Sequence, residues 1–230
     1  GASIPPGAER SRTSRHLAEY WHLELEEAWV DNRGNMDIQE GLVTAMVEAA
    51  LKERKEELLL LRKDLAPLYE IKPPFKRMRY EEAIQRLRGQ GFEIEWGCDL
   101  GAVEERALTA EEAVPVFVTN YPKECKAFYM KEHPENPDLV LCDDLLAPEG
   151  YGEIIGGSQR EDDYDRLLSR IREEKLPEEA YDWYLDLRKY GTFVHSGFGM
   201  GIERVVAWVC GLQHIREASP WPRTIYRLNP

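Results

Sequence analysis

Apolar and polar positions alternate from Glu19 to Val30, a period of two that predicts a half-buried strand. The apolar face of this strand carries Trp21, Leu23, Leu25 and Trp29, and the polar face carries His22, Glu24 and Glu26. We therefore expect a strand that packs one face against a core and presents two carboxylates on the other.

A helical pattern follows this strand. Asp37 with Glu40 three residues later is similar to a capping box, which predicts a helix start. The apolar positions that follow recur at helical spacing, at Leu42, Val43, Met46, Val47, Ala50 and Leu51. A charged helical stretch continues to about Leu65 and ends before Pro73-Pro74. Shorter helices are predicted over 79–88 and 161–174.

Three further strands are predicted, over 114–119, 139–142 and 151–155. A last helix has its apolar stripe at Ile202, Val205, Val206 and Val209, and Gly211 closes it in the C′ position. Strands and helices do not alternate as β-α-β units, which favours an antiparallel sheet over a parallel one. We expect one α+β domain over residues 1–230, with an antiparallel β-sheet flanked by helices.

The composition limits the class of protein. A chain of 230 residues with 43% apolar content can bury a sizeable core. It has no apolar run long enough for a membrane span and no secretory signal, so we expect a cytoplasmic protein without membrane contact. The net charge of −13 argues against general nucleic-acid coating, because phosphate binding needs a basic surface. The four cysteines form no Cys-x-x-Cys pair and are expected to be free buried thiols.

Three glycines at alternate positions, Gly197, Gly199 and Gly201, precede Glu203-Arg204 and the last helix. Alternate glycines let a flat ring lie on bare backbone. The planar cation of Arg204 can stack on such a ring. The pattern also suits a tight turn before a core helix, and it lacks the spacing of the dinucleotide fingerprint. It therefore predicts a nucleotide site, a turn, or both.

Four ordered segments resemble one family. The glycine triplet, Glu203-Arg204, the apolar helix, Ile215-Arg216 and Pro222-Arg223 are similar to the third signature motif of the class II aminoacyl-tRNA synthetases, in the aspartyl, asparaginyl and lysyl branch. Glu9 to Trp21 resembles the second motif of that family. Pro115–Glu124 and Tyr151–Arg160 resemble strands of its asparaginyl members. The resemblance covers nearly the whole chain.

The resemblance implies ATP-dependent activation of asparagine to asparaginyl-adenylate and transfer to tRNA(Asn). It implies ATP and Mg²⁺ as cofactors and a homodimer. A local basic patch, formed by Arg10, Arg12, Arg15 and His16, is the candidate tRNA contact, although these side chains could instead face ATP phosphates or solvent. Two other function classes stay open: a tRNA-independent asparagine synthetase-like ligase of the same fold, and a non-catalytic truncated paralogue that binds a partner.

Two acids match the metal-binding residues of the family. Glu153 follows a glycine in a predicted strand, and Asp144 ends the preceding strand. Adjacent strands can bring such carboxylates onto one face, where oxygen ligands suit Mg²⁺. Asp143 is the alternative to Asp144. Apart from the resemblance, these are ordinary acids near strand ends.

Two residues match the family's amino-acid pocket. Arg160 corresponds to the arginine that reads the substrate side chain, although a surface salt bridge to Glu161 or Asp162 is the simpler interpretation. Glu24 would accept a hydrogen bond from the asparagine NH₂ and repel aspartate. Members that use aspartate carry Asp at this position, so Glu24 favours asparagine. Glu24 could also be part of the solvated face of its strand.

The remaining matches concern ATP. Glu9 corresponds to the acid that accepts from the adenine amino group, and Arg15 and His16 correspond to loop residues near the phosphates. Gly201 and Arg204 correspond to the adenine platform, with Arg204 also reaching the γ-phosphate. Arg204 and Glu153 are the expected catalytic residues.

The chain departs from the family at its N-terminal end. Gly7 stands where the second motif has an arginine that grips the α-phosphate, and losing such a donor costs about 10²-fold in rate. The first motif and the anticodon-binding barrel are not recognisable. We therefore expect a partial catalytic domain, from the second motif loop to the third motif, with weak or absent ATP-pyrophosphate exchange.

Overall fold

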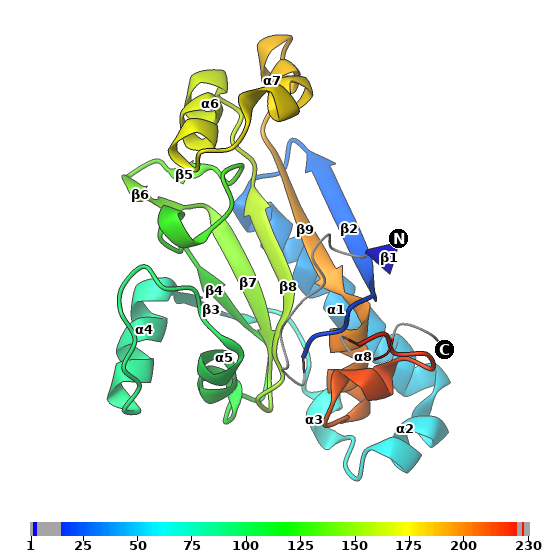
Figure 1. The fold of residues 1–230 in the computed structure, drawn as a ribbon. Coiled ribbons are helices and arrows are strands. Elements are labelled where there is room, and N and C mark those ends of the chain that lie inside the picture. The colour runs from blue at the N-terminus through cyan, green and yellow to red at the C-terminus, as the bar shows by residue number, and fades with distance from the viewer. Residues whose placement is uncertain (1, 4–14, 225–226, 228–230) are drawn as a thin grey trace.

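The computed structural model describes residues 2–3, 15–224 and 227 (Figure 1). Its centre is a seven-stranded sheet in the order β1-β2-β9-β8-β7-β4-β3. The strands are β1 (Ala2–Ser3), β2 (Tyr20–Ala28), β3 (Lys76–Arg79), β4 (Val116–Thr119), β7 (Cys142–Ala147), β8 (Gly152–Gln159) and β9 (His195–Gly201). A separate hairpin is formed by β5 (Glu132–His133) and β6 (Asn136–Val140). The expected fold of an antiparallel sheet flanked by helices is confirmed.

One strand pair is an exception to the antiparallel order. β3 pairs with β4 in parallel, with Lys76 opposite Val116. The chain between them forms α4 (Tyr80–Gly89) and α5 (Ala102–Thr109), the long helical crossover that a parallel pair needs. The predicted helix at 79–88 is therefore confirmed to within one residue, whereas α5 was not predicted.

The helix α1 (Asn32–Glu53) covers the back of the sheet (Figure 1). Its predicted stripe is confirmed, because Val43, Val47 and Leu51 are buried in the core. Its predicted start was wrong. The N-cap is Asp31, whose Oδ1 accepts the N–H of Gly34 at 2.8 Å.

The misplaced start has a physical reason. The first turns of α1 bury polar side chains against the sheet, so no hydrophobic stripe marks them: Asn35 and Gln39 are fully buried. Asp37, the predicted cap, is exposed and pairs instead with Arg77. The charged stretch predicted to about Leu65 forms the short helix α2 (Lys55–Leu61), and a further short helix, α3 (Ala66–Tyr69), lies beyond it.

The main core lies between the sheet and the helices α1 and α8 (Ile202–Cys210). Phe198, Met200 and Trp208 are among its buried side chains. Gly211 ends α8 with φ of 69°, the left-handed conformation that the sequence predicted at C′. A second core joins α4 and α5 to β4 and β7 through buried residues that include Tyr80, Leu87, Val118 and Tyr121.

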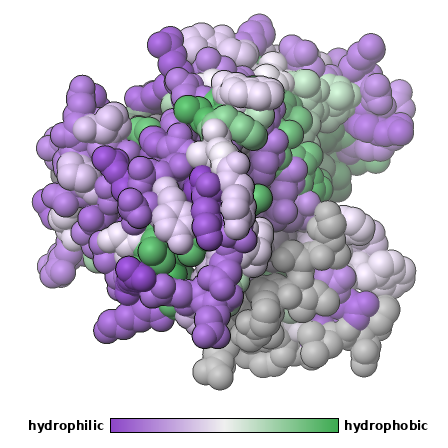
Figure 2. Space-filling view, turned by 90° about the horizontal axis from the view of Figure 1, so that it is seen from above, coloured by the Kyte–Doolittle hydropathy of each residue, from purple (hydrophilic) through white to green (hydrophobic). Residues whose placement is uncertain are grey.

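The segment between β8 and β9 forms α6 (Tyr164–Glu173) and α7 (Asp182–Lys189) at one end of the sheet (Figure 1). These helices bury Leu167, Ile171 and Leu185 in a small core of their own. Seen from this end, the surface is mainly hydrophilic, with apolar side chains in small separate areas (Figure 2). The predicted helix 161–174 is thus confirmed, and α7 was not predicted.

The strand predictions hold with local corrections. β2 packs Leu23 and Leu25 against the core as expected, but Trp21 and Trp29 are 61% and 79% exposed. β2 lies beside the two-residue β1 at the sheet edge, and Trp29 lies beyond its end with φ of 61°. The predicted strand 139–142 is two strands, β6 and β7, separated at Leu141.

The four cysteines are free as expected, but only Cys142 is buried; Cys125 and Cys210 are partly buried, and Cys98 is exposed. Within the described ranges, no helix combines the length and apolar character that crossing a membrane requires.

Candidate active site

The candidate site occupies the face of the sheet opposite α1. On β2, His22, Glu24 and Glu26 stand opposite Gly201, Gly199 and Gly197 of β9, and Gly199 in turn stands opposite Gly156 of β8. Because these neighbours lack side chains, the polar side chains of β2 can extend across β9. The predicted polar face of β2 therefore forms one wall of the site.

The structure corrects the interpretation of the glycine triplet. It lies in β9, an interior strand of the sheet between β2 and β8, rather than in a turn. A Cβ on Gly197 would stand 2.4 Å from the carboxyl carbon of Glu26, and a Cβ on Gly199 would stand 2.4 Å from Cε1 of His22. Both glycines make room for side chains of β2; Gly197 is buried, whereas Gly199 also lines the cavities described below. Gly201 keeps its predicted accessible position, because the nearest atom to a Cβ there is Cδ of Arg204 at 3.3 Å.

Glu24, Arg160 and Glu153 line one cavity of about 560 Å³. Its opposite wall is aromatic and comes from the segment before β5 and from the α6–α7 region. The wall includes Phe128, Tyr129, Tyr181, Trp183 and Tyr184. The structure therefore brings the two predicted amino-acid-binding residues together. Glu24 is 75% exposed at the cavity, and its Oε1 lies 3.1 Å from Nδ1 of His22.

The guanidinium of Arg160 is held on several sides. Its Nε donates to both carboxylate oxygens of Glu26, at 3.0 and 3.1 Å, and its Nη1 donates to Oγ of Ser158 at 2.5 Å. The ring of Tyr129 lies 5.0 Å from the guanidinium carbon. The salt bridge expected with Glu161 or Asp162 is absent from the described contacts, since both acids pair with Lys131. Sequence reasoning placed Glu26 on the right face but missed its role.

A second cavity of about 320 Å³ adjoins the first, sharing His22, Glu153 and Gly199 with it. Arg204, Gly201, Arg15 and His16 line this second cavity, together with Tyr20. Sequence reasoning missed Tyr20. Its one indication in the sequence is that it is aromatic and stands at the start of the strand that carries Glu24. Of the residues predicted for ATP and for the amino acid, those that the structure describes therefore line two adjoining cavities.

Glu153 stands between the two cavities. Its Oε2 accepts from Nη1 of Arg204 at 3.0 Å. Burial by itself raises the pKa of the Glu153 carboxyl, but the charges of Arg204, Lys126 and Arg15 outweigh this effect and leave the pKa below its ordinary value. Glu153 is therefore an anion in the folded protein at neutral pH.

The second predicted acid, Asp144, shares the face of Glu153. A Cβ on Gly156 would stand 3.3 Å from Oε1 of Glu153 and 3.7 Å from Oδ1 of Asp144, so both oxygens border the space above this glycine. The other carboxylate oxygen of Asp144 accepts from Nζ of Lys126 at 2.7 Å. Burial raises the pKa of Asp144, and Glu153 adds to the increase while Lys126 opposes it.

Asp143 points to the other face of the sheet. It is fully buried, and its Oδ2 accepts from Nε2 of Gln39 of α1 at 2.6 Å. Burial raises the pKa of Asp143 to about 7. The period of two along β7 thus separates the two neighbouring acids, and only Asp144 lies beside Glu153.

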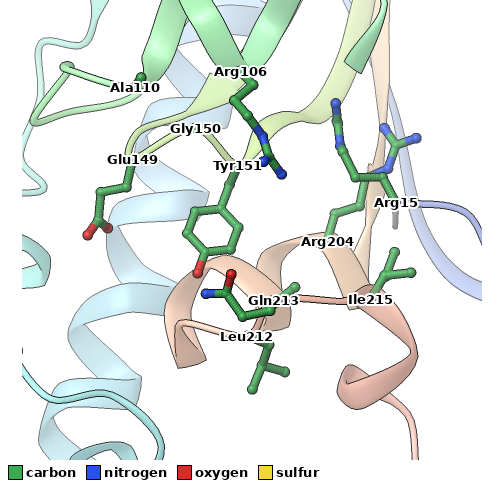
Figure 3. A pocket seen from close by; sticks show the side chains of 11 residues that line it. Arg15, Arg106, Ala110, Glu149, Gly150, Tyr151, Arg204, Leu212, Gln213 and Ile215 are labelled. Carbon is green, nitrogen blue, oxygen red and sulfur yellow. The ribbon is translucent and has the colours of Figure 1, made fainter. Parts of the chain in front are cut away.

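A third cavity, of about 250 Å³, lies on the other side of Arg15 and Arg204. The side chain of Arg106 extends from α5 toward these two arginines (Figure 3). Glu105, its neighbour on α5, is buried and forms an ion pair with Arg15. Burial raises the pKa of Glu105 to about 7 despite the charge of Arg15. Glu105 carries no motif signal, and sequence reasoning missed it.

Four sequence predictions concern Glu9, Gly7, Arg10 and Arg12, which lie outside the described residues. Within the described ranges, no group of three or more His, Cys, Asp or Glu side chains is arranged to hold a metal ion by itself. Any metal ion at Glu153 and Asp144 would therefore need further ligands from a substrate or from water.

The sequence has close relatives among characterised proteins. It is 59% identical over 223 residues to the asparagine–tRNA ligase of Pyrococcus horikoshii, a match that covers 97% of this chain and 51% of the relative. The asparagine–tRNA ligase of Pelotomaculum thermopropionicum is 52% identical over 223 residues, with 97% and 52% covered. The chain spans about half the length of the curated relatives that it matches.

Solved structures agree with these matches. The asparaginyl-tRNA synthetase of P. horikoshii in complex with asparaginyl-adenylate superposes with a TM-score of 0.95 at 59% identity, over 97% of this chain and 51% of that one. The aspartyl-tRNA synthetase of Entamoeba histolytica superposes with a TM-score of 0.88 at 29% identity, over 100% and 48%. Residues 8–225 match the family described as tRNA synthetases class II (D, K and N). The chain therefore belongs to the class II tRNA synthetases of the D, K and N group.

Proposed function

We propose that this chain carries the asparagine-activating site of an asparagine–tRNA ligase. The observation that carries the proposal is that Glu24 and Arg160 line one cavity, which shares Glu153 with the adjoining cavity of Arg204. An amide-recognising pair next to a cationic site is what activation of asparagine by ATP requires. The relatives named asparagine–tRNA ligase support the same assignment.

The reaction joins two anions. A carboxylate oxygen of asparagine attacks the α-phosphorus of ATP, the bond to the β-phosphate breaks, and pyrophosphate leaves. Negative charge moves toward the leaving group, so fixed cations contribute more than a proton-transfer residue. Arg204 supplies such a cation, and its ion pair with Glu153 fixes the direction of its guanidinium. Gly201 and Tyr20, which line the same cavity, leave room for a purine ring beside Arg204.

The choice of asparagine rests on charge. The carboxylate of Glu24 would accept a hydrogen bond from the substrate NH₂, while Arg160 would donate to the substrate oxygen. Glu26 neutralises the charge of Arg160 and fixes the orientation of its guanidinium. A substrate with a second carboxylate therefore gains less binding free energy from this arginine. Aspartate would also meet the negative charge of Glu24. The pocket therefore favours the amide over the acid.

The donor set at Glu153 and Asp144 fits Mg²⁺. Two carboxylate oxygens border the space above Gly156, and Mg²⁺ is typically bound by one or two carboxylates together with substrate phosphates. When bound there, Mg²⁺ would supply positive charge to phosphate oxygens. Lys126 adds a cation of its own beside Asp144.

The second half of the proposal is transfer to tRNA(Asn). A ribose hydroxyl of the tRNA attacks the asparaginyl carbonyl, and AMP leaves. Of the basic patch predicted for tRNA contact, the structure describes Arg15 and His16, which both line the second cavity. That position favours a contact with ATP over one with tRNA. A homodimer, a cytoplasmic location and one catalytic domain over residues 1–230 remain part of the proposal.

Ligand binding tests the proposal even if turnover is slow. Asparagine and ATP with Mg²⁺ should each raise the melting temperature of the purified chain, and aspartate should do so less. No stabilisation by either ligand would favour a non-catalytic paralogue. Ammonia-dependent formation of asparagine from aspartate without tRNA would favour the tRNA-independent ligase.

Turnover tests the role of Gly7. Because Gly7 stands where the family has an arginine, asparagine-dependent ATP-pyrophosphate exchange should be weak in this chain. Gly7→Arg should raise the exchange rate by about 10²-fold. Strong exchange by the unmodified chain would show that the arginine is dispensable here.

A further inference from the structure

Glu105 is a buried carboxylate that the proposed reaction does not use. It lies in α5, and its side chain is 8% exposed. Its two described polar partners are distant in the sequence, at Arg15 and Glu153. Burying a charge is unfavourable unless it is paired and hydrogen-bonded. The position of these partners indicates what the buried charge does.

The contacts of Glu105 converge on the backbone of Glu153. Oε2 of Glu105 accepts the backbone N–H of Glu153 at 2.7 Å and pairs with Nη1 of Arg15. Nη2 of the same arginine donates to the backbone carbonyl of Glu153 at 2.8 Å. Glu105 and Arg15 therefore bind both the backbone N–H and the backbone carbonyl of Glu153. The side chain of Glu153 is the acid that stands between the two cavities of the candidate site.

This stretch of backbone is irregular and needs such partners. The register between β7 and β8 shifts at Leu145 and Leu146, and Glu153 is the residue opposite Leu146. Irregularities of this kind interrupt ladder hydrogen bonds and redirect a side chain, often next to active sites. The preceding Gly152 has φ of 74°, and a Cβ on it would stand 2.6 Å from both Nη1 of Arg15 and Oε2 of Glu105. The glycine is what allows the pair to approach this strand.

We propose that Glu105 is a positioning residue, which together with Arg15 holds the backbone of Glu153 so that its carboxylate faces Arg204 and the ATP cavity. This inference rests on the proposed function. It differs from a purely structural role, in which the Glu105–Arg15 pair would only attach the chain around Arg15 to α5. A structural tie would affect folding stability and, because Arg15 lines the second cavity, the affinity for Mg²⁺-ATP, but it would leave the Glu153 carboxylate facing Arg204.

The test is calorimetric titration of the whole chain with two ligands, Mg²⁺-ATP and asparagine. Glu105→Gln keeps the size of the side chain and one acceptor oxygen but removes the carboxylate that pairs with Arg15, and the titrations are run at pH 8, above the pKa of about 7 of Glu105. We expect Mg²⁺-ATP affinity to fall by about 10-fold or more, as is typical when a residue that orients a metal ligand is changed. Asparagine affinity should fall less than Mg²⁺-ATP affinity, because Glu24 and Arg160, which are proposed to read the asparagine side chain, are not polar partners of Glu105, and Glu153 alone links Glu105 to their cavity. Glu104→Gln, one residue earlier on α5 and outside the three cavities, is the matched control.

The outcomes separate this inference from the proposed function. If the unmodified chain binds neither ligand, the proposed function fails and the positioning role fails with it. If it binds both, and Glu105→Gln binds Mg²⁺-ATP as tightly as the unmodified chain, only the positioning role is overturned. Should Glu105→Gln not fold, Glu105→Asp takes its place, because it keeps the charge but shortens the reach to Glu153. A crystal structure of the folded variant should show the Glu153 carboxylate turned away from Arg204, and an unmoved carboxylate would contradict the proposal.

Discussion

The carboxylate of Glu26 lies over the backbone of Gly197, and this position lets it reach Arg160 on the far side of β9. A Cβ on Gly197 would stand 2.4 Å from the carboxyl carbon of Glu26 and 2.5 Å from the carbonyl oxygen of Leu25. The strand order β2-β9-β8 places Glu26 and the end of β8 on opposite sides of β9. A glycine in the middle strand is therefore required for an ion pair between its two neighbours.

Gly197→Ala should weaken both the sheet and the proposed amino-acid pocket. The added methyl group would overlap Glu26 and the backbone of β2, and such overpacking costs about 1–3 kcal/mol. Urea unfolding should show the loss of stability, and titration should show weaker asparagine binding because Arg160 loses its orientation. Unchanged asparagine affinity would mean that Glu26 does not orient Arg160.

Gly41→Ala is the control for Gly197→Ala, and we expect it to stabilise the protein instead of destabilising it. Gly41 lies on the exposed side of α1, and a Cβ there would meet no atom within 4 Å. Alanine lowers the entropy of the unfolded chain and favours the helix, so the free energy of unfolding should rise by about 0.5–1 kcal/mol. The same urea experiment measures this change in the free energy of unfolding. A decrease would contradict the open space that the structure places around Gly41.

Glu24→Gln should reduce discrimination between asparagine and aspartate. The variant removes the negative charge that we propose repels aspartate, and hydrogen bonds to charged groups contribute about 1.5–3 kcal/mol. The ratio of the two affinities should fall by about 10-fold or more in titrations with each amino acid. Glu27→Gln, on the same strand but outside the cavity, should leave the ratio unchanged.

Arg62→Met should destabilise the fold without touching the site. Arg62 donates to the carbonyl oxygens of Asp64 and Trp208, at 2.9 and 3.1 Å, and pairs with Glu149 at 2.5 Å. Its side chain is 8% exposed, so its loss removes a buried cation with these three contacts and leaves the carbonyl oxygen of Trp208 with the N–H of Gly211 as its one described donor. We expect a loss of about 2–4 kcal/mol in urea unfolding.

The control for Arg62 is Arg54→Met. The side chain of Arg54 is 71% exposed, and its pair with Glu57 spans 3.9 Å. Exposed pairs of this kind contribute little, so the change should stay within about 0.5 kcal/mol. Equal losses for both variants would contradict the role given to Arg62.

Glu112 should give a pH-dependent contribution to stability. Burial would raise its pKa, but hydrogen bonds from Arg86 and Lys76 outweigh burial and lower the pKa below its ordinary 4.5. A carboxyl with a lowered folded-state pKa stabilises the protein above its unfolded pKa, and this contribution is lost as pH falls through the folded pKa. The stability difference between the unmodified chain and Glu112→Gln should therefore be constant near neutral pH and shrink below about pH 4.5. A constant difference down to acid pH would contradict the lowered pKa.

Local patterns predicted much of the fold. The alternation of β2, the stripe of α1 and the left-handed Gly211 all depend on residues close together in the sequence, and they are present as predicted. The start of α1 was missed because its first turns bury polar side chains. The exposure of Trp21 and Trp29 was missed because it depends on where the sheet ends.

The family and the residue types of the candidate site were determined by the sequence alone, because motifs record which groups the chemistry needs in a fixed order along the chain. Which groups touch was decided only by the tertiary structure. Arg160 pairs with Glu26 and not with Glu161, Asp144 rather than Asp143 lies beside Glu153, and Glu105 reaches a peptide 48 residues away. The physical reason is that strand order, register and one irregularity in β8 set these contacts, and each depends on hydrogen bonds between segments that are distant in the sequence.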